Sequence, residues 1–168
     1  MAWTISSNGP LGTNGIETTN TTQGEIPLGT IVKAKDPTYG EGEFIYLLGV
    51  ASTVVGSLVK YNATTYQTAL VTNTANQDVP VAVAMSANVA GQYGWYQISG
   101  LATVKKTAVT VTPQVTVFLS STAGRVKVVA SAGLQVVGAR SANLTTVTST
   151  TSTVVLCINR PHLQSQIT

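Results

Sequence analysis

Charged residues are the scarcest class in this 168-residue sequence. Only 9% of the residues are Asp, Glu, Lys or Arg, whereas soluble domains average about 25%. A free monomer usually covers much of its surface with Lys and Glu side chains. Two interpretations therefore stay open. Either Thr, Ser, Asn and Gln form a neutral polar surface, or neighbouring proteins cover much of the molecule, because interface cores are depleted in charge.

Acidic residues are missing from the second half of the chain. Through residue 84 there are six acids and three lysines, whereas from Met85 onward there are six basic residues and no acid. Either these few charges are scattered by chance, or the two halves carry complementary patches that meet between subunits or on an acidic partner. The basic residues stand singly or as the pair Lys105-Lys106, without the basic runs of a nucleic-acid-binding surface, so no nucleic-acid partner is expected. The acids are Glu17, Glu25, Asp36, Glu41, Glu43 and Asp78.

Cysteine and histidine occur once each, as Cys157 and His162. One cysteine excludes a disulfide within the chain, and the pair falls short of the four ligands of a structural zinc site. Nucleophilic catalysis needs a nucleophile, a base and an orienting acid in one place, and no motif supplies them. The one S-x-x-K match, Ser57 to Lys60, reads as a strand, where a spacing of three puts the two side chains on opposite faces. We expect no enzymatic activity, no metal and no cofactor.

Long apolar runs are absent as well. The longest uncharged run, residues 44–59, contains Gly and Ser and is shorter than the roughly 20 residues of a membrane-spanning helix. The opening residues, MAWTISSNGPLG, have neither the basic nor the apolar region of a secretory signal. We therefore expect no membrane partner, and a protein that stays in the cytoplasm in which it is made unless something carries it out.

What the sequence does contain is short β-branched segments separated by turn residues. The segments GTIVKAKD (29–36) and EFIYLLGV (43–50) are separated by the turn residues PTYGEG, and GSLVKYN and YQTALVT flank a hairpin turn at ATT. Pro113 interrupts the alternating run 107–121, which indicates an edge, a bulge or two separate strands. No stretch shows a convincing helical period. The prediction is an all-β sandwich or barrel over residues 25–162, followed by a tail at 163–168.

Residues 1–24 differ from this pattern. Gly, Asn, Thr and Ser dominate, and isolated apolar residues punctuate them. Such a segment alone buries too little surface to offset its ordering entropy. It is either a flexible terminus or an extended arm that becomes ordered on a neighbouring molecule. In the second case its anchors are the four apolar residues Trp3, Ile5, Leu11 and Ile16.

The stretch QYGWYQISG, residues 92–100, holds three of the ten aromatic residues. In a strand, Tyr93 and Trp95 share one face, while Gly94 and Tyr96 share the other. Large side chains therefore point both ways, as in a strand that lies between a core and a second layer or subunit. Gly94 permits close approach on its face. The alternative is that the aromatic residues form an exposed binding platform.

Several strand and turn segments together form a recognisable pattern: Gly29–Val32, Asp36–Gly40, Gly42–Leu47 with Gly49-Val50, Val59 and Tyr61, Pro80–Ala84, Tyr93–Gly100 and Arg160-Pro161. In these segments the chain resembles the head decoration (capsid cement) proteins of tailed bacteriophages. The resemblance covers about residues 26–105 well and the rest loosely, and it does not cover the N-terminal arm or the residues after Pro161. The structural signature consists of Phe44, Tyr46, Tyr93, Gly94, Trp95 and Tyr96.

The resemblance implies a non-enzymatic virion protein without a cofactor. Such a protein binds the outer surface of an expanded capsid, with the major capsid protein as its partner, and cements neighbouring capsid subunits. It would be made in the cytoplasm of the host bacterium and form a homo-oligomer, with trimers favoured and dimers possible. The four apolar residues of the arm then become candidate capsid or subunit contacts. The alternative from a different class is a virion-surface adhesin or carbohydrate-binding module.

Overall fold

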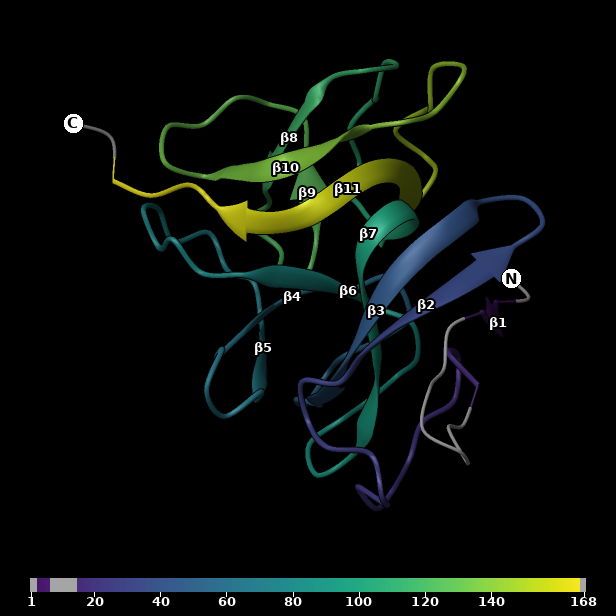
Figure 1. Cartoon of the computed structure of the whole chain (residues 1–168). Helices are drawn as coiled ribbons and strands as arrows, with labels where there is room; N and C mark the ends of the chain where they lie inside the picture. The colour runs from purple at the N-terminus through teal and green to yellow at the C-terminus, as the bar shows by residue number, and fades with distance from the viewer. Residues whose placement is uncertain (1–2, 7–14, 167–168) are drawn as a thin grey trace.

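The computed structural model describes residues 3–6 and 15–166, and within them every regular element is a β-strand. The eleven strands of the described residues belong to one sheet, and every pair of strands runs antiparallel. The predicted all-β fold is confirmed. The strands are β1 (Thr4–Ile5), β2 (Ile31–Asp36), β3 (Gly40–Leu48), β4 (Leu58–Tyr61), β5 (Thr68–Leu70), β6 (Val81–Ala84), β7 (Tyr93–Lys105), β8 (Thr116–Leu119), β9 (Val126–Lys127), β10 (Gln135–Ser141) and β11 (Thr153–Leu163) (Figure 1).

The two predicted hairpins form for local reasons. At the β2–β3 turn the Asp36 carboxylate accepts hydrogen bonds from the backbone N–H groups of Thr38 and Tyr39 at 2.8 and 2.9 Å. At the β4–β5 turn the Asn62 side chain accepts the same kind of pair from residues 64 and 65 at 2.8 and 2.9 Å. Both are Asx turns, in which a short polar side chain replaces a backbone acceptor.

Pro113 separates two strand segments, which was one of the three predicted outcomes. Before it, Val111 pairs with Val147 in an isolated bridge, and after it β8 begins at Thr116. The ladder of strand hydrogen bonds is interrupted between Val111 and Thr116, because proline has no N–H to donate.

Strand β7 is the longest, with 13 residues, and it changes partners along its length. Its first half pairs with β3 and its second half with β11. Between the halves the register against β3 shifts, and Gly100 has a φ of 99°, with a hypothetical Cβ only 2.6 Å from the Glu41 carbonyl oxygen. The Gln97 amide donates hydrogen bonds to the Ser99 and Leu101 carbonyl oxygens at 3.0 and 2.9 Å. The strand therefore curls out of the plane of β3, as Figure 1 shows.

Beyond this curl the sheet closes on itself. The pairing runs β4–β6–β7–β11–β10–β8. The turn after β8 then comes back to β4, where the Leu58 N–H donates a hydrogen bond to the Gly124 carbonyl oxygen at 2.9 Å. The enclosed aliphatic cluster is lined by Leu, Val, Ile and Ala side chains from these strands, among them Leu58, Val83, Val104, Leu119 and Leu156. This half of the molecule is a small barrel.

Before the curl, strands β3 and β7 are covered on both faces. On one face an aliphatic and tyrosine layer from β4 and β6 packs against Ile45, Leu47 and Tyr96. On the other face lies the aromatic cluster, which comprises Trp3, Ile16, Ile26, Val32, Ala34, Phe44, Tyr46, Met85 and Trp95. Strand β11 ends at Leu163, which is buried, so the predicted boundary at residue 162 falls one residue inside the last strand.

Candidate interaction surface

The aromatic signature forms an internal frame. Tyr46 and Trp95 are cross-strand partners whose ring centroids lie 5.0 Å apart, and Tyr93 stacks on Tyr46 at 6.3 Å. Trp95 is 0% exposed, and all ten aromatic side chains of the chain are buried or half-buried. An indole or phenol ring binds a sugar with an accessible face, so the stretch 93–96 is not an exposed platform.

The second face of this stretch is filled as well. A Cβ placed on Gly94 would lie 2.2 Å from the Asn88 side-chain nitrogen, which confirms the predicted close approach. Tyr96 points to the same face and is buried against the layer from β4 and β6. Both layers that cover the strand belong to the chain itself, so the predicted second layer is not a neighbouring subunit.

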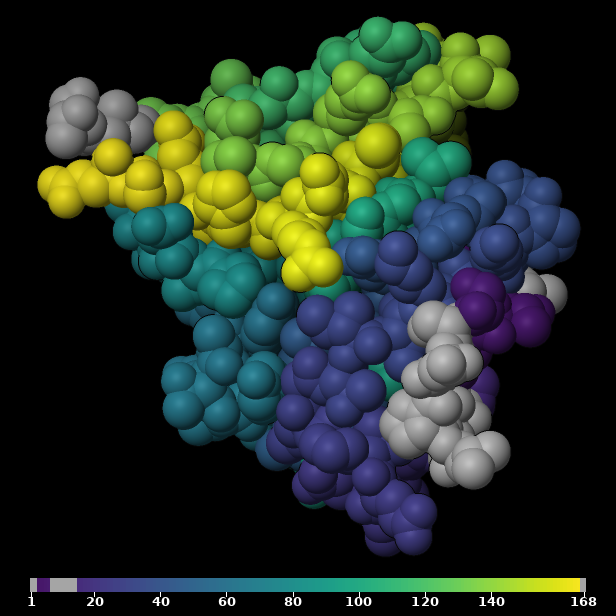
Figure 2. Space-filling view, viewed as in Figure 1, coloured from purple at the N-terminus to yellow at the C-terminus, as the bar shows by residue number. Residues whose placement is uncertain are grey.

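The predicted anchors of the arm lie against their own domain. Trp3 meets Phe44 edge-on at 4.9 Å, and Ile16 is 1% exposed within the same aromatic cluster. Ile5 is half-buried against this cluster, and β1 pairs with β2. In the space-filling view residues 3–6, drawn in purple, rest on the blue surface of β2 and β3 (Figure 2).

The prediction that these side chains wait for a neighbour is therefore wrong for Trp3 and Ile16. Their nearest large apolar surface is the sheet of the same chain, and burial there removes them from solvent without a partner. Leu11, the fourth candidate contact, lies outside the described residues.

The rare chemistry-bearing residues do not come together. His162 is exposed and pairs with Pro80 in an isolated bridge, whereas Cys157 is half-buried in the middle of β11. The Lys60 ammonium donates to the Gln77 side-chain oxygen at 2.5 Å and not to Ser57. Within residues 3–6 and 15–166, no three His, Cys, Asp or Glu side chains gather as metal ligands would.

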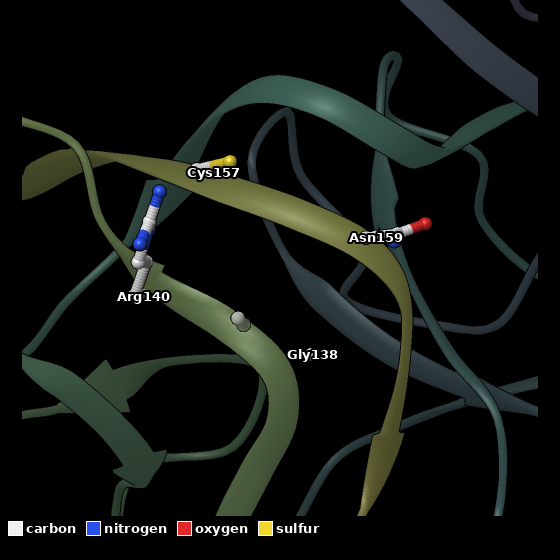
Figure 3. Close-up of a pocket in the computed structure, with 5 residues that line it drawn as sticks. Gly138, Arg140, Cys157 and Asn159 are labelled. Atoms are coloured by element: carbon white, nitrogen blue, oxygen red, sulfur yellow. The ribbon is translucent and has the colours of Figure 1, made fainter.

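The outward face of the barrel carries two adjoining shallow hollows. The first has a volume of about 370 Å³ and is lined by Gly138, Ala139, Arg140, Cys157 and Asn159. The second has a volume of about 280 Å³; Arg140 and Cys157 line it too, together with Leu101 and Leu144. Leu144 projects into solvent and is 96% exposed. Figure 3 shows Arg140 on β10 beside Cys157 on β11. We call the combined area the β10–β11 face.

The β10–β11 face suits a contact more than a reaction. Its residues are cross-strand neighbours, since Cys157 pairs with both Arg140 and Leu101. Its lining residues supply one cation, a thiol, apolar side chains and strand backbone, and none of them is a His, Asp, Glu or Lys. The sequence did not indicate this face. About half of its lining residues lie on β10 and β11, and only the register of that strand pair brings them together.

The segregated charges are partly paired within the chain. Arg160 forms a 2.9 Å ion pair with Glu43, which joins the basic end of the sequence to its acidic half, and Lys33 lies 3.8 Å from Glu41. Of these two pairs, only Arg160–Glu43 joins the two halves, because Lys33 and Glu41 both lie in the first half. Three of the four side chains are more than half exposed, and exposed ion pairs contribute about 0–1 kcal/mol.

Lys106 is the one buried cation among the described residues and was not foreseen. Its side chain is 1% exposed, and its ammonium donates to the carbonyl oxygens of Val109 at 2.8 Å and Thr148 at 3.0 Å. Burial lowers the pKa of Lys106 below its ordinary value. The side chain joins the β7–β8 connection to the β10–β11 loop, so its role is structural.

No family model and no curated protein matches this chain. No helix in the described part of the chain is long and apolar enough to cross a bilayer.

Proposed function

We propose that the protein is a structural, non-enzymatic virion component that binds the outside of a bacteriophage capsid and cements neighbouring major capsid subunits. The proposal begins from the resemblance in residues 26–105. The observation that carries it is the placement of the aromatic residues. All ten side chains are buried or half-buried, so they act as the frame of a rigid β body and leave its outer surface to other residues.

The outer surface is suited to a permanent contact. Few charges must be desolvated there, because only 9% of the residues are charged. The β10–β11 face offers Leu144 as a projecting apolar side chain beside two shallow hollows. Strands β10 and β11 form the floor of the first hollow, whereas Leu144 projects from the loop between them.

A clamp of this kind acts through contact energy. Each bound copy that touches two capsid subunits adds a bridge that internal pressure must break before the subunits separate. An oligomer, with the trimer favoured, multiplies a modest single-site affinity through effective concentration. The burial of Trp3 and Trp95 weakens the adhesin alternative, since neither indole ring presents an open face to a sugar.

Binding to expanded capsids that lack the protein tests the proposal. Purified protein should co-sediment with such capsids and raise the temperature at which they release their DNA. The variant Leu144→Asp should bind at least about tenfold more weakly, because a charge replaces an apolar contact. The matched control is Val129→Asp, which introduces the same charge at another exposed apolar position and should bind normally. Protein that stays in the supernatant at all concentrations would overturn the proposal.

A further inference from the structure

A second pocket lies on the barrel, away from the β10–β11 face. It has a volume of about 360 Å³ and lies between the loop before β4 and the turn between β8 and β9. Backbone bonds fix both walls, since the Lys105 N–H donates to Gly56 at 2.8 Å and the Gly124 N–H to Val71 at 2.9 Å. Its lining consists of Ser52, Val54, Ser57, Leu70, Lys105, Thr122, Ala123, Gly124 and Arg125.

This Lys105–Arg125 pocket holds two cations and no acid. Lys105 comes from the end of β7 and Arg125 from the residue before β9. Neither has a carboxylate partner among the described residues. The Arg125 guanidinium donates one hydrogen bond, to the Lys106 carbonyl oxygen at 3.3 Å, which leaves most of its five N–H donors available.

The surroundings of the two cations favour a carboxylate on a peptide. Two like charges in one pocket repel each other, and an anion between them relieves that repulsion. The rim is apolar, with Val54 48% exposed and Leu70 half-buried beside it. A Glu side chain flanked by short uncharged residues matches both the charge of the pocket and the apolar rim.

The chain itself carries such a segment. Residues 21–25, TTQGE, are all exposed and form a turn before β2, drawn in indigo in Figure 1. The turn is anchored by the buried Ile26, whose carbonyl oxygen accepts a hydrogen bond from the Gln23 side chain at 3.2 Å. Glu25 is the only charged residue of the turn and has no cationic partner among the described residues.

We propose that the Glu25 turn of one copy inserts into the Lys105–Arg125 pocket of a second copy. Turn and pocket are different patches of the same chain, so the contact is heterologous and leads to a closed ring or to an open filament. The proposal gives a location to the self-association in the proposed function. It requires no capsid, so its failure and the failure of capsid binding are separate results.

Sedimentation velocity of the purified protein over a range of concentrations tests the contact. The pocket variant Lys105→Gln/Arg125→Gln should raise the dissociation constant of self-association by about tenfold or more, in the range measured for close charge pairs at interfaces. The matched control Lys33→Gln/Lys35→Gln removes the same charge from two exposed positions on β2, outside the pocket, and should change it by less than about threefold. Added salt should weaken the wild-type contact and have less effect on the pocket variant.

A charge exchange identifies the occupant. Lys105→Glu/Arg125→Glu should abolish self-association, and Glu25→Arg in the same chain should restore it, because both charges of the pocket and the charge of the turn are then reversed. Asp78→Arg is the control, since Asp78 is an exposed acid in a different loop. Circular dichroism and the unfolding midpoint of each variant verify that it is folded. A wild-type protein that stays monomeric, a pocket variant that assembles normally, or rescue by Asp78→Arg instead of Glu25→Arg would overturn the proposal.

Discussion

The two regions joined by β7 are stabilised in different ways. The barrel half encloses an aliphatic cluster whose buried members are all Val, Leu, Ile and Ala, and its wall is a ring of hydrogen-bonded strands. The other half stacks four large rings, Trp3, Phe44, Tyr46 and Trp95, on the outer face of β3 and β7. The described residues of the N-terminal segment pair with the sheet through the two-residue β1 and a bridge from Asn20 to Tyr93.

This difference indicates where each half is vulnerable. In the barrel, burial is shared among many small side chains, so the loss of one leaves most contacts intact. In the aromatic half, a few rings each bury a large area, and their cover is held mainly by side chains. The largest effects of single substitutions are therefore expected on the aromatic side of the molecule.

The largest effect is expected from Trp95→Ala. The side chain is 0% exposed at the centre of the aromatic cluster, and its removal should lower the free energy of unfolding by about 3–5 kcal/mol. Val104→Ala, at an equally buried barrel position, should lower it by about 2 kcal/mol. Urea denaturation followed by circular dichroism measures both values. Equal losses from the two substitutions would remove the contrast between the regions.

The next effect tests the cover of the rings. Ile16→Ala should lower the free energy of unfolding by about 2–5 kcal/mol, as for other buried Ile residues, because Ile16 packs inside the aromatic cluster. The half-buried Ile5 provides the comparison, and Ile5→Ala should have a smaller effect. An unchanged stability of the Ile16 variant would instead favour a flexible terminus, one of the two interpretations of the sequence.

Lys106 permits the corresponding test on the barrel side. Lys106→Met keeps the length of the side chain but leaves the carbonyl oxygens of Val109 and Thr148 without their donor, which should lower the stability at pH 7 by about 1–3 kcal/mol. Burial lowers the pKa of Lys106 in the folded state, so the unfolded chain holds this proton more tightly. Wild-type stability should therefore rise with pH between the lowered pKa and the ordinary value of 10.5.

Denaturant unfolding at pH 7 and at pH values up to about 9 measures this slope, because tyrosines with the ordinary pKa of about 10 are still mostly protonated there. The Met variant should show a smaller rise, because it lacks the titrating group. A rise of the same size in both proteins would assign the slope to another group and contradict the role given to Lys106.

Local features could be predicted from the sequence, and long-range ones could not. The β2–β3 and β4–β5 hairpins follow from Asp36 and Asn62, whose side chains act within three residues of their own position. The two-sided burial of Tyr96 and Trp95 follows from strand alternation, which is also local. The all-β class could be predicted because these strand and turn patterns recur along the chain.

The packing of the N-terminal segment over the aromatic rings could not be predicted from local sequence patterns. Widely spaced apolar residues such as Trp3 and Ile16 indicate that a segment has anchors, but not whether the sheet that receives them belongs to the same chain. Lys106 looked like half of an exposed basic pair, because its acceptor at Thr148 lies 42 positions away. Both interaction surfaces also depend on how distant strands and loops meet.

The smallest expected effect concerns a side-chain hydrogen bond between the N-terminal segment and the rings. The Asn20 amide donates to the Tyr46 hydroxyl oxygen at 3.0 Å, a contact that should contribute about 1 kcal/mol. A double-mutant cycle with Tyr46→Phe and Asn20→Ala isolates it as the coupling energy between the two substitutions.

Burial raises the pKa of Tyr46, so above pH 10 the unfolded chain loses this proton before the folded protein does, and stability should fall as the pH rises. Tyr46→Phe should make that alkaline loss shallower; a coupling near zero together with an unchanged alkaline slope would show that the segment covers the rings by apolar packing alone.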